Sequence, residues 1–283
     1  VSRDHGWIFE VPARAKGLVD PIPLKAMGRF VHEAAAIDPK TGVVYLTEDR
    51  LDGLFYRFLP DRKGRLARGG RLQALALRED RERDFRNWPN DGKANAGTGQ
   101  AIAPGASADA AWIDLDEVDS PNGDLKDRGF ARGALRFARG EGLAVGTSAD
   151  GRTEIYISCT AGGPIRLGQV FRYRPSAKEG TPGEADAPGT LDLFVETDDT
   201  NILKNCDNVA VAPWGDVILC EDGYDYDAQF LRGVTPDGEF YTIAGNSKSE
   251  FCGACFSPDG EVMFVNIQTP GVTFAIRGPW RKA

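Results

Sequence analysis

Short runs of alternating apolar and polar residues cover most of the 283-residue chain, and Gly, Pro, Asp or Asn separates one run from the next. Alternation with a period of two is typical of half-buried β-strands, whereas amphipathic helices repeat their apolar positions every three or four residues. The helical spacing is scarce in this sequence. The pattern therefore predicts an all-β fold.

Four segments share the layout of a β-hairpin. Each has a strand of small residues, a turn that is built on Pro or Asp and closed by Gly, and a strand rich in Val, Ile, Leu, Tyr or Phe. Gly readily adopts the positive φ that tight hairpin turns require. The four segments are 32–50, 140–160, 206–223 and 249–268.

Repetition at this scale is typical of propeller blades, which are roughly 40–50 residues long in known families. The turns at Pro213 and Pro258 are 45 residues apart, which fits one blade. The earlier spacings are larger, so insertions or weaker blades, such as 190–203, would lie between the hairpins. We expect a β-propeller of about five to six blades, and we leave open whether it is complete at its N-terminus.

The composition shows no boundary between independent domains, so we expect a single propeller domain over residues 1–283. Two stretches interrupt the strand pattern. Residues 79–112 are rich in Gly, Ala, Asp and Asn, and residues 174–190 are rich in Pro, Gly and Ala. Long loops in a compact domain are usually functional or mobile, and we expect both stretches to be surface excursions.

Acidic residues recur where each hairpin begins. Glu141 and Glu250 lie ten residues before their turn Gly, Glu33 lies nine before, and Asp207 lies eight before. The first strand of each propeller blade lines the central channel, so the four acids would converge on one mouth of that channel. The second strand returns to the same face because a hairpin is antiparallel, and in one repeat it ends on Glu221.

A ring of inward-facing carboxylates cannot stay ionised and unpaired, so either some are protonated or cations lie among them. Oxygen ligands suit hard cations, calcium first, and iron or manganese could share such a site. The predicted metal ligands are Glu33, Glu141, Asp207, Glu221 and Glu250. Any one of these acids alone would also fit a solvated hairpin end.

Arg139 lies two residues before Glu141, and residues two apart in a strand point the same way. A guanidinium beside a metal carboxylate could hold an oxyanion such as phosphate. Arg139 would equally serve to neutralise its acidic neighbours. The sequence leaves these two functions open.

The net charge of −8 and the pI near 5.0 argue against a nucleic-acid partner, which needs a clustered basic face. They are compatible with binding divalent cations, and equally with a surface that only aids solubility. The chain has no run of about 20 apolar residues that would span a membrane. It shows no signal peptide, so the protein is either cytoplasmic or has lost a leader.

Several long segments, spread in order from residue 5 to residue 280, resemble the PhoX family of bacterial alkaline phosphatases. They are "GRFVHEAAAIDPKTGVVYLTED", "GLFYRFLP", "FARGEG", "GQVFRY", "DNVAVAPWGDVILCEDG" and "EFCGACFSPDGEVMFVNIQTPGVTFAIRGPW". The resemblance implies a β-propeller with calcium and iron ions at one mouth. It also implies export to the periplasm or beyond and the hydrolysis of phosphate esters, the activity of a phosphoric monoester hydrolase.

Residue by residue, the resemblance implies that Glu33 and Glu141 are metal ligands and that Arg139 is the catalytic, substrate-binding contact to phosphate. Asp207, Glu221 and Glu250 follow from the repeat instead. The expected partner is a small-molecule phosphoester, and we expect a monomer. Members of the family usually carry an upstream strand ending in Cys-Glu-Glu, whose cysteine is implicated as an iron ligand. This sequence begins just after that point. Three explanations are open: the sequence is a fragment of a longer polypeptide, the cysteine strand is present outside this sequence, or the protein is a divergent member that has lost the iron.

Two other functions fit the same architecture. "DNVAVAPWGDVILCED" also resembles the strand pairs of gluconolactonase-type propellers, which would make the protein a calcium-dependent lactonase or esterase. A non-catalytic propeller with structural calcium is the other alternative, because propellers support all three functions.

Overall fold

The computed structural model describes residues 4–81, 83–92, 96–98, 102–223, 228–247 and 249–280. Within these residues the chain folds into strands β1 to β16, the short helix α1 (Leu125–Ala131) and three 3₁₀ helices, Lys25–Met27, Leu66–Arg68 and Pro182–Asp186. The all-β prediction is therefore confirmed. Among the described residues, no helix is long and apolar enough to cross a membrane.

The strands form four antiparallel units, and each unit begins with one of the four predicted hairpins. The units are β1 (His32–Ile37), β2 (Val44–Glu48), β3 (Phe55–Pro60) and β4 (Gly70–Leu77); β6 (Gly140–Thr147), β7 (Thr153–Cys159), β8 (Gln169–Arg174) and β9 (Thr190–Glu196); β10 (Cys206–Val211), β11 (Val217–Glu221), β12 (Gln229–Val234) and β13 (Phe240–Asn246); and β14 (Phe251–Phe256), β15 (Val262–Ile267) and β16 (Val272–Arg277). Strand β5 (Ser107–Asp114) pairs with β4 and β9, so the first two units share one nine-stranded sheet.

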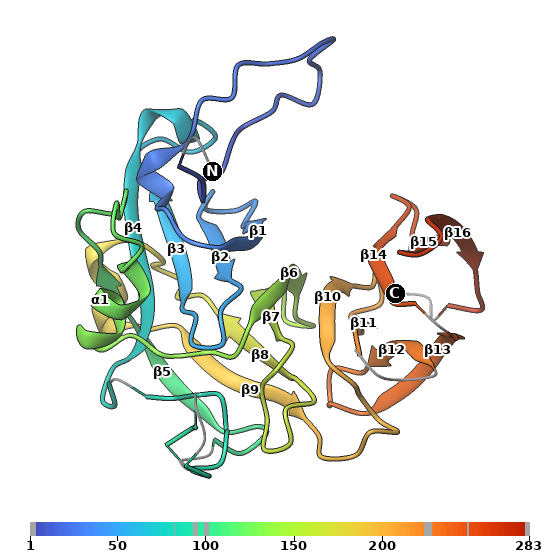
Figure 1. Cartoon of the computed structure of the whole chain (residues 1–283). Helices are drawn as coiled ribbons and strands as arrows, with labels where there is room; N and C mark the ends of the chain where they lie inside the picture. Colours follow the sequence, from blue (N-terminus) through green and yellow to red (C-terminus); the bar gives the residue numbers. More distant parts are fainter. Residues whose placement is uncertain are drawn as a thin grey trace.

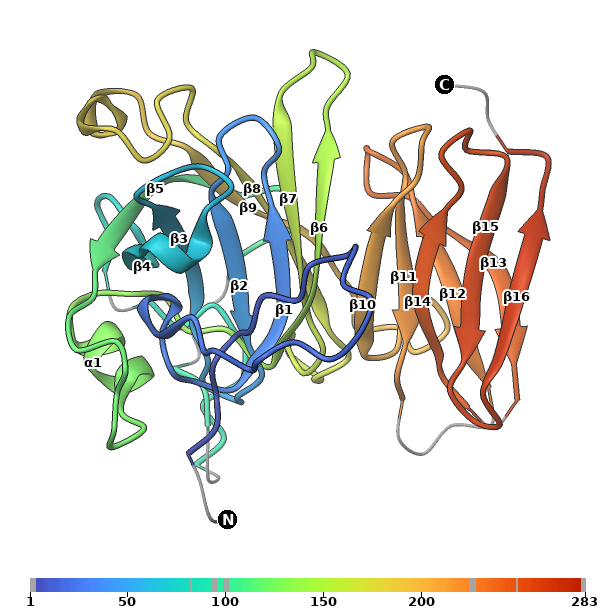
Figure 2. The ribbon, with the colours of Figure 1, turned by 90° about the horizontal axis from the view of Figure 1, so that it is seen from above.

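The first strands of the units, β1, β6, β10 and β14, pack beside one another in that order, and the other strands extend outward from them (Figure 1). Figure 2 shows that these four strands run in the same direction, with the hairpin turns at one end. Radial sheets around a shared set of inner strands are the blades of a β-propeller. We call the end at which the four inner strands begin the mouth.

The sequence predicted about five to six blades, and the described residues form four. The candidate blade at 190–203 contributes β9, the outermost strand of the second blade. The excursion expected at 79–112 ends in β5, whose Ala-rich sequence hides its alternation. Both stretches pair with strands that are distant in the sequence, and local periodicity does not reveal that pairing.

The hydrophobic core lies between neighbouring blades. Val217 and Leu219 of β11 are buried against the second blade, whereas Ile218 and Cys220 on the opposite face of β11 are buried against the fourth. A strand that is covered on both faces has a continuous apolar sequence instead of an alternating one. This double burial explains the run "VILC" at 217–220.

Buried ion pairs attach the loop at 174–190 to the first blade. Arg57 on β3 is 2% exposed, and its guanidinium lies 2.6 Å from both Glu179 and Glu184. The hydroxyl groups of Tyr45 and Tyr173 also donate hydrogen bonds to Glu179. Such a network offsets the cost of burying its charges only while all of its members are present.

Replacing Arg57 with Met should lower the free energy of unfolding by about 3–5 kcal/mol, because Glu179 would remain buried without its cation. Urea denaturation measures this change. The matched control is Arg71→Met on β4, which breaks an exposed pair with Asp114 and should cost no more than about 1 kcal/mol. Equal effects of the two substitutions would show that the network does not anchor the loop.

Candidate metal centre

A β-bulge interrupts every inner strand near the mouth. A bulge inserts one extra residue and turns a side chain in a new direction. The four bulges lie between His32 and Ala35, Gly140 and Leu143, Cys206 and Val209, and Cys252 and Cys255. In the first three blades, the residue that follows the start of the bulge is an acid, Glu33, Glu141 or Asp207. The repeat seen in the sequence is therefore also a repeat of the backbone.

The second strands of the first and third blades, β2 and β11, each end at two consecutive acids, and the two acids of each pair have different environments. Glu48 is buried inside the first blade and accepts hydrogen bonds from the Tyr56 hydroxyl at 2.7 Å and the Leu54 amide at 3.2 Å. Successive residues of a strand point to opposite faces. The next residue, Asp49, accordingly lies with Glu33 and Glu141 at the mouth.

Glu221 repeats the arrangement of Glu48. It is fully buried, 2.8 Å from the Arg232 guanidinium, and it accepts hydrogen bonds from the Phe230 and Lys204 amides. Among the described residues, it belongs to no group of acids that could hold a metal ion. Its neighbour Asp222 lies at the mouth instead. The structure therefore places four of the five predicted ligands in carboxylate groups at the mouth and leaves Glu221 apart.

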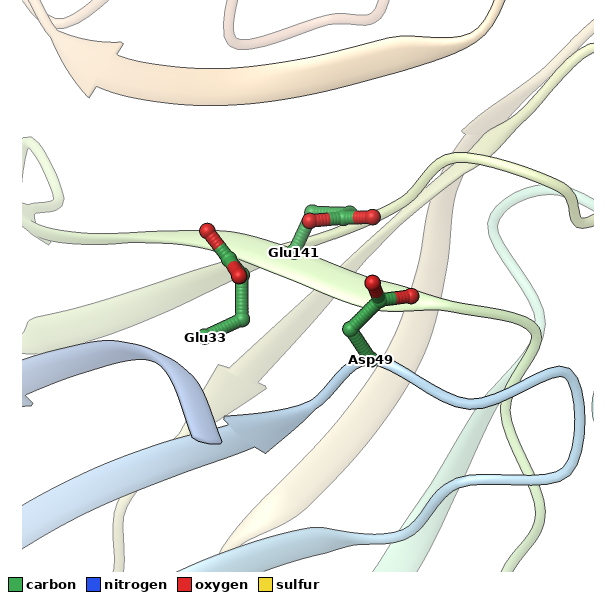
Figure 3. A group of neighbouring side chains, drawn as sticks. All are labelled: Glu33, Asp49 and Glu141. Carbon is green, nitrogen blue, oxygen red and sulfur yellow. The ribbon is translucent and has the colours of Figure 1, made fainter. Parts of the chain in front are cut away.

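The first carboxylate group consists of Glu33, Asp49 and Glu141, which offer oxygen atoms that all lie within 4.8 Å of one another. Figure 3 shows the three side chains approaching a common space from β1, from the end of β2 and from β6. This group therefore joins the first blade to the second.

The second carboxylate group consists of Asp207, Asp222 and Glu250, again with oxygen atoms within 4.8 Å of one another. Asp207 belongs to β10, Asp222 follows β11, and Glu250 precedes β14. This group joins the third blade to the fourth. Glu250 is therefore not the structural equivalent of Glu141, although both lie ten residues before their turn Gly.

The carboxylates of both groups are in environments that disfavour their charged forms. Burial raises the pKa of Glu141 to about 8, and the nearby charge of Asp207 adds to this effect. Burial and the charges of Asp222 and Glu33 raise the pKa of Asp207 to about 6. Burial and Asp222 raise the pKa of Glu250 to about 7. Because Glu33 and Asp207 belong to different groups, the two groups act on each other electrostatically.

These residues fit a divalent cation. Each group offers carboxylate oxygens alone, the donor set that calcium prefers, and calcium binds six to eight oxygen atoms. A cation between the carboxylates would also remove the repulsion that raises their pKa values. Iron accepts carboxylate oxygens as well, so the donor set admits it beside calcium.

Arg139 lies between two members of the first carboxylate group. It directly precedes β6, with φ +55, so it is not in the strand conformation that the sequence predicted. Its Nε lies 2.8 Å from Asp49 Oδ1, and its Nη2 lies 2.5 Å from Glu141 Oε1. The guanidinium is half-buried at the mouth. This position is compatible with both functions that the sequence left open, binding an oxyanion and neutralising the acidic neighbours.

The raised pKa values predict how stability depends on pH. A carboxyl group whose pKa is higher in the folded state stabilises that state while it is protonated, and the contribution is lost as the pH rises through the folded pKa. Without metal, Tm should therefore fall as the pH rises from about 4, near the ordinary pKa of a carboxyl group, to about 8, the raised pKa of Glu141, with Asp207 and Glu250 contributing within this range. Added calcium should raise Tm more at about pH 9 than at about pH 5. Thermal melts with calcium or a chelator test this, and an equal shift at both pH values would contradict it.

The profile of a family described as "Alkaline phosphatase PhoX" matches residues 1–271. The chain belongs to this family. Among solved structures, it is similar to Pseudomonas fluorescens PhoX in complex with vanadate, a transition state analogue, with 20% identity and a TM-score of 0.62. That match covers 88% of this chain and 51% of the other, so the chain spans about half the length of that PhoX protein.

A weaker similarity links the chain to XC5397 from Xanthomonas campestris, described as a gluconolactonase, with 14% identity and a TM-score of 0.36. That match covers 87% of this chain and 72% of the other. A search of curated protein sequences gives no significant match. At 20% identity the PhoX structure bears on the fold alone, and the PhoX family assignment comes from the match over residues 1–271.

Proposed function

We propose that the chain belongs to a metal-dependent phosphatase that hydrolyses phosphate monoesters at the mouth of the propeller. The observation that carries the proposal is the guanidinium of Arg139, which is held between Asp49 and Glu141 beside carboxylates whose charge the protein disfavours. Cations bound among carboxylates, together with one fixed arginine, are suited to a phosphoryl group with several anionic oxygens. Membership of the PhoX family supports the same conclusion.

In this proposal Glu33, Asp49 and Glu141 hold one metal site, and Asp207, Asp222 and Glu250 hold another. Calcium is the first candidate for both sites, with iron as an additional ion. When bound, the cations would supply positive charge to the phosphoryl oxygens and make an attacking water more acidic. Glu221 would keep its structural pairing with Arg232 and would not act as a ligand.

The contribution of Arg139 follows from its position. Its guanidinium is fixed before substrate arrives, so it can donate hydrogen bonds to non-bridging phosphoryl oxygens without reorganisation in the transition state. Asp49 and Glu141 hold it in place from two blades.

The substrate would be a small phosphoester, and we propose that the protein acts as a monomer in the periplasm or outside the cell, as its family suggests. A lactonase remains the alternative to be tested, although no observation at the mouth favours a lactone over a phosphate ester. The two substrate classes differ in charge, so one set of assays separates them.

The protein supplied with calcium and iron should hydrolyse p-nitrophenyl phosphate, and Glu33→Gln should reduce kcat/KM at least about 100-fold, because the first carboxylate group loses a charged ligand. The control is Glu239→Gln, an exposed acid at the β12–β13 turn, which should keep full activity. Turnover of a lactone panel without phosphoester hydrolysis would replace the proposal with the lactonase alternative. Equal phosphoester turnover by the wild type and Glu33→Gln would also contradict it.

A further inference from the structure

A cleft of about 720 Å³ borders the mouth on the side of the first blade. Its lining includes His32, which precedes Glu33, and Arg50, which follows Asp49. The cleft is thus formed in part by residues adjacent to two members of the first carboxylate group. The opposite walls come from the N-terminal segment and from the start of α1.

The N-terminal wall of the cleft is fixed by several contacts. The indole of Trp7 donates a hydrogen bond to Asp119 at 2.8 Å, and the Phe30 amide donates one to the carbonyl of Gly6 at 3.1 Å. The charged groups of Lys25 and Arg29 lie 4.9 and 5.2 Å from the centre of the Trp7 ring. A wall held in this way is formed before any ligand enters, which lowers the entropic cost of binding.

Three cationic side chains line the cleft, and they differ in their partners. Arg29 is paired with Asp4 at 3.1 Å, and Lys126 is paired with Asp52 at 2.7 Å. Among the described residues, no acid pairs with Arg50, which is exposed in the cleft. A guanidinium without an internal anion presents its donors to a carboxylate or phosphate from outside.

The backbone of Arg50 is also hydrogen-bonded to the backbone of Arg139, the residue proposed to hold the phosphoryl group. Its backbone carbonyl accepts a hydrogen bond from the Arg139 amide at 2.8 Å. The two arginines flank Asp49: Arg50 follows it in the chain, and Arg139 forms an ion pair with it. A ligand that places one anionic group at Arg139 and a second in the cleft at Arg50 would therefore span two residues whose backbones are hydrogen-bonded.

We propose that the cleft receives the leaving alcohol of the phosphate ester and that Arg50 binds a second anionic group on that alcohol. This inference rests on the proposed function, because it assigns the phosphoryl group to Arg139. It defines a substrate class, the phosphate esters of alcohols that carry a carboxylate or another phosphate. Esters of neutral alcohols would occupy the same cleft without the contact to Arg50.

Three phosphonates test the proposal, because their C–P bond is not hydrolysed and their binding is independent of turnover. They are 3-phosphonopropionate, propane-1,3-diphosphonate and the neutral-ended 3-hydroxypropylphosphonate. Calorimetry with calcium present should show that at least one of the first two binds about tenfold more tightly than the third, the difference expected for one charge-assisted contact. The stronger of the two identifies the preferred anion.

Arg50→Gln should abolish this preference and leave the affinity for 3-hydroxypropylphosphonate unchanged. The control is Arg65→Gln, an exposed arginine in the β3–β4 connection at the end remote from the mouth, which should keep the preference. Thermal melts establish that both variants are folded. Equal binding of all three phosphonates, or a preference that survives in Arg50→Gln, would overturn the proposal.

The outcomes also separate this proposal from the proposed function. Arg50-dependent binding without hydrolysis of any phosphoester would refute the phosphatase and retain an anion site in the cleft. Hydrolysis of p-nitrophenyl phosphate without any Arg50-dependent preference would retain the phosphatase and refute the assignment of the cleft.

Discussion

Glu141→Gln is expected to remove calcium binding by the first carboxylate group and to lower kcat/KM for phosphate monoesters at least about 100-fold. Glu141 is the most buried acid of that group and also forms an ion pair with Arg139. The amide keeps the shape of the side chain but loses the negative charge that both the cation and the arginine require. Calorimetric titration of calcium and steady-state kinetics measure the two effects.

The matched control for Glu141→Gln is Glu154→Gln. Glu154 is also buried in the second blade, at the start of β7, where it is paired with Arg174 at 2.8 Å. Its loss should lower the free energy of unfolding without changing calcium stoichiometry. If Glu141→Gln bound calcium as the wild type does, the first carboxylate group would not be a metal site.

Arg139→Lys is expected to lower kcat for phosphate monoesters by about 10²–10³-fold, the cost of losing a preorganised donor to transition-state charge. Lysine keeps the positive charge but not the planar fork that contacts both Asp49 and Glu141. The substitution should also weaken competitive inhibition by inorganic phosphate. Calcium stoichiometry should remain unchanged because none of the six carboxylates is altered.

The control for Arg139→Lys is Arg136→Lys in the same segment. The Arg136 guanidinium lies 3.5 Å from the centre of the Phe130 ring, close to α1, so its replacement should leave kcat unchanged. Wild-type kcat and phosphate affinity in Arg139→Lys would mean that Arg139 only neutralises its acidic neighbours, the alternative that the sequence left open.

The hairpins were predictable because their information is local. Alternation marked the strands, and Gly42, Gly151, Gly215 and Gly260 marked the turns, where each has a positive φ. The number of blades depends on pairing between distant strands. Ser107 of β5 pairs with Asp192 of β9, 85 positions later, and a strand's own sequence does not identify its partner.

The candidate site was predictable to the same extent. Counting back from the turn Gly identified Glu33, Glu141, Asp207 and Glu250, which the structure places at the mouth. Glu221 was predicted instead from the end of the second strand, and Asp222 and Asp49 were passed over. Alternation indicates that one acid of each Glu-Asp pair faces the mouth. The register decides which one: Glu48 pairs with His32, and Glu221 pairs with Cys206.

We propose that the mouth of this propeller holds metal ions between neighbouring blades. Elemental analysis of the purified protein, after dialysis against calcium and iron and removal of free metal, tests it most directly. We expect at least one bound ion for each carboxylate group, and a lower metal content in both Glu141→Gln and Asp222→Asn. A wild-type protein free of metal, or a metal content that neither substitution changes, would contradict it.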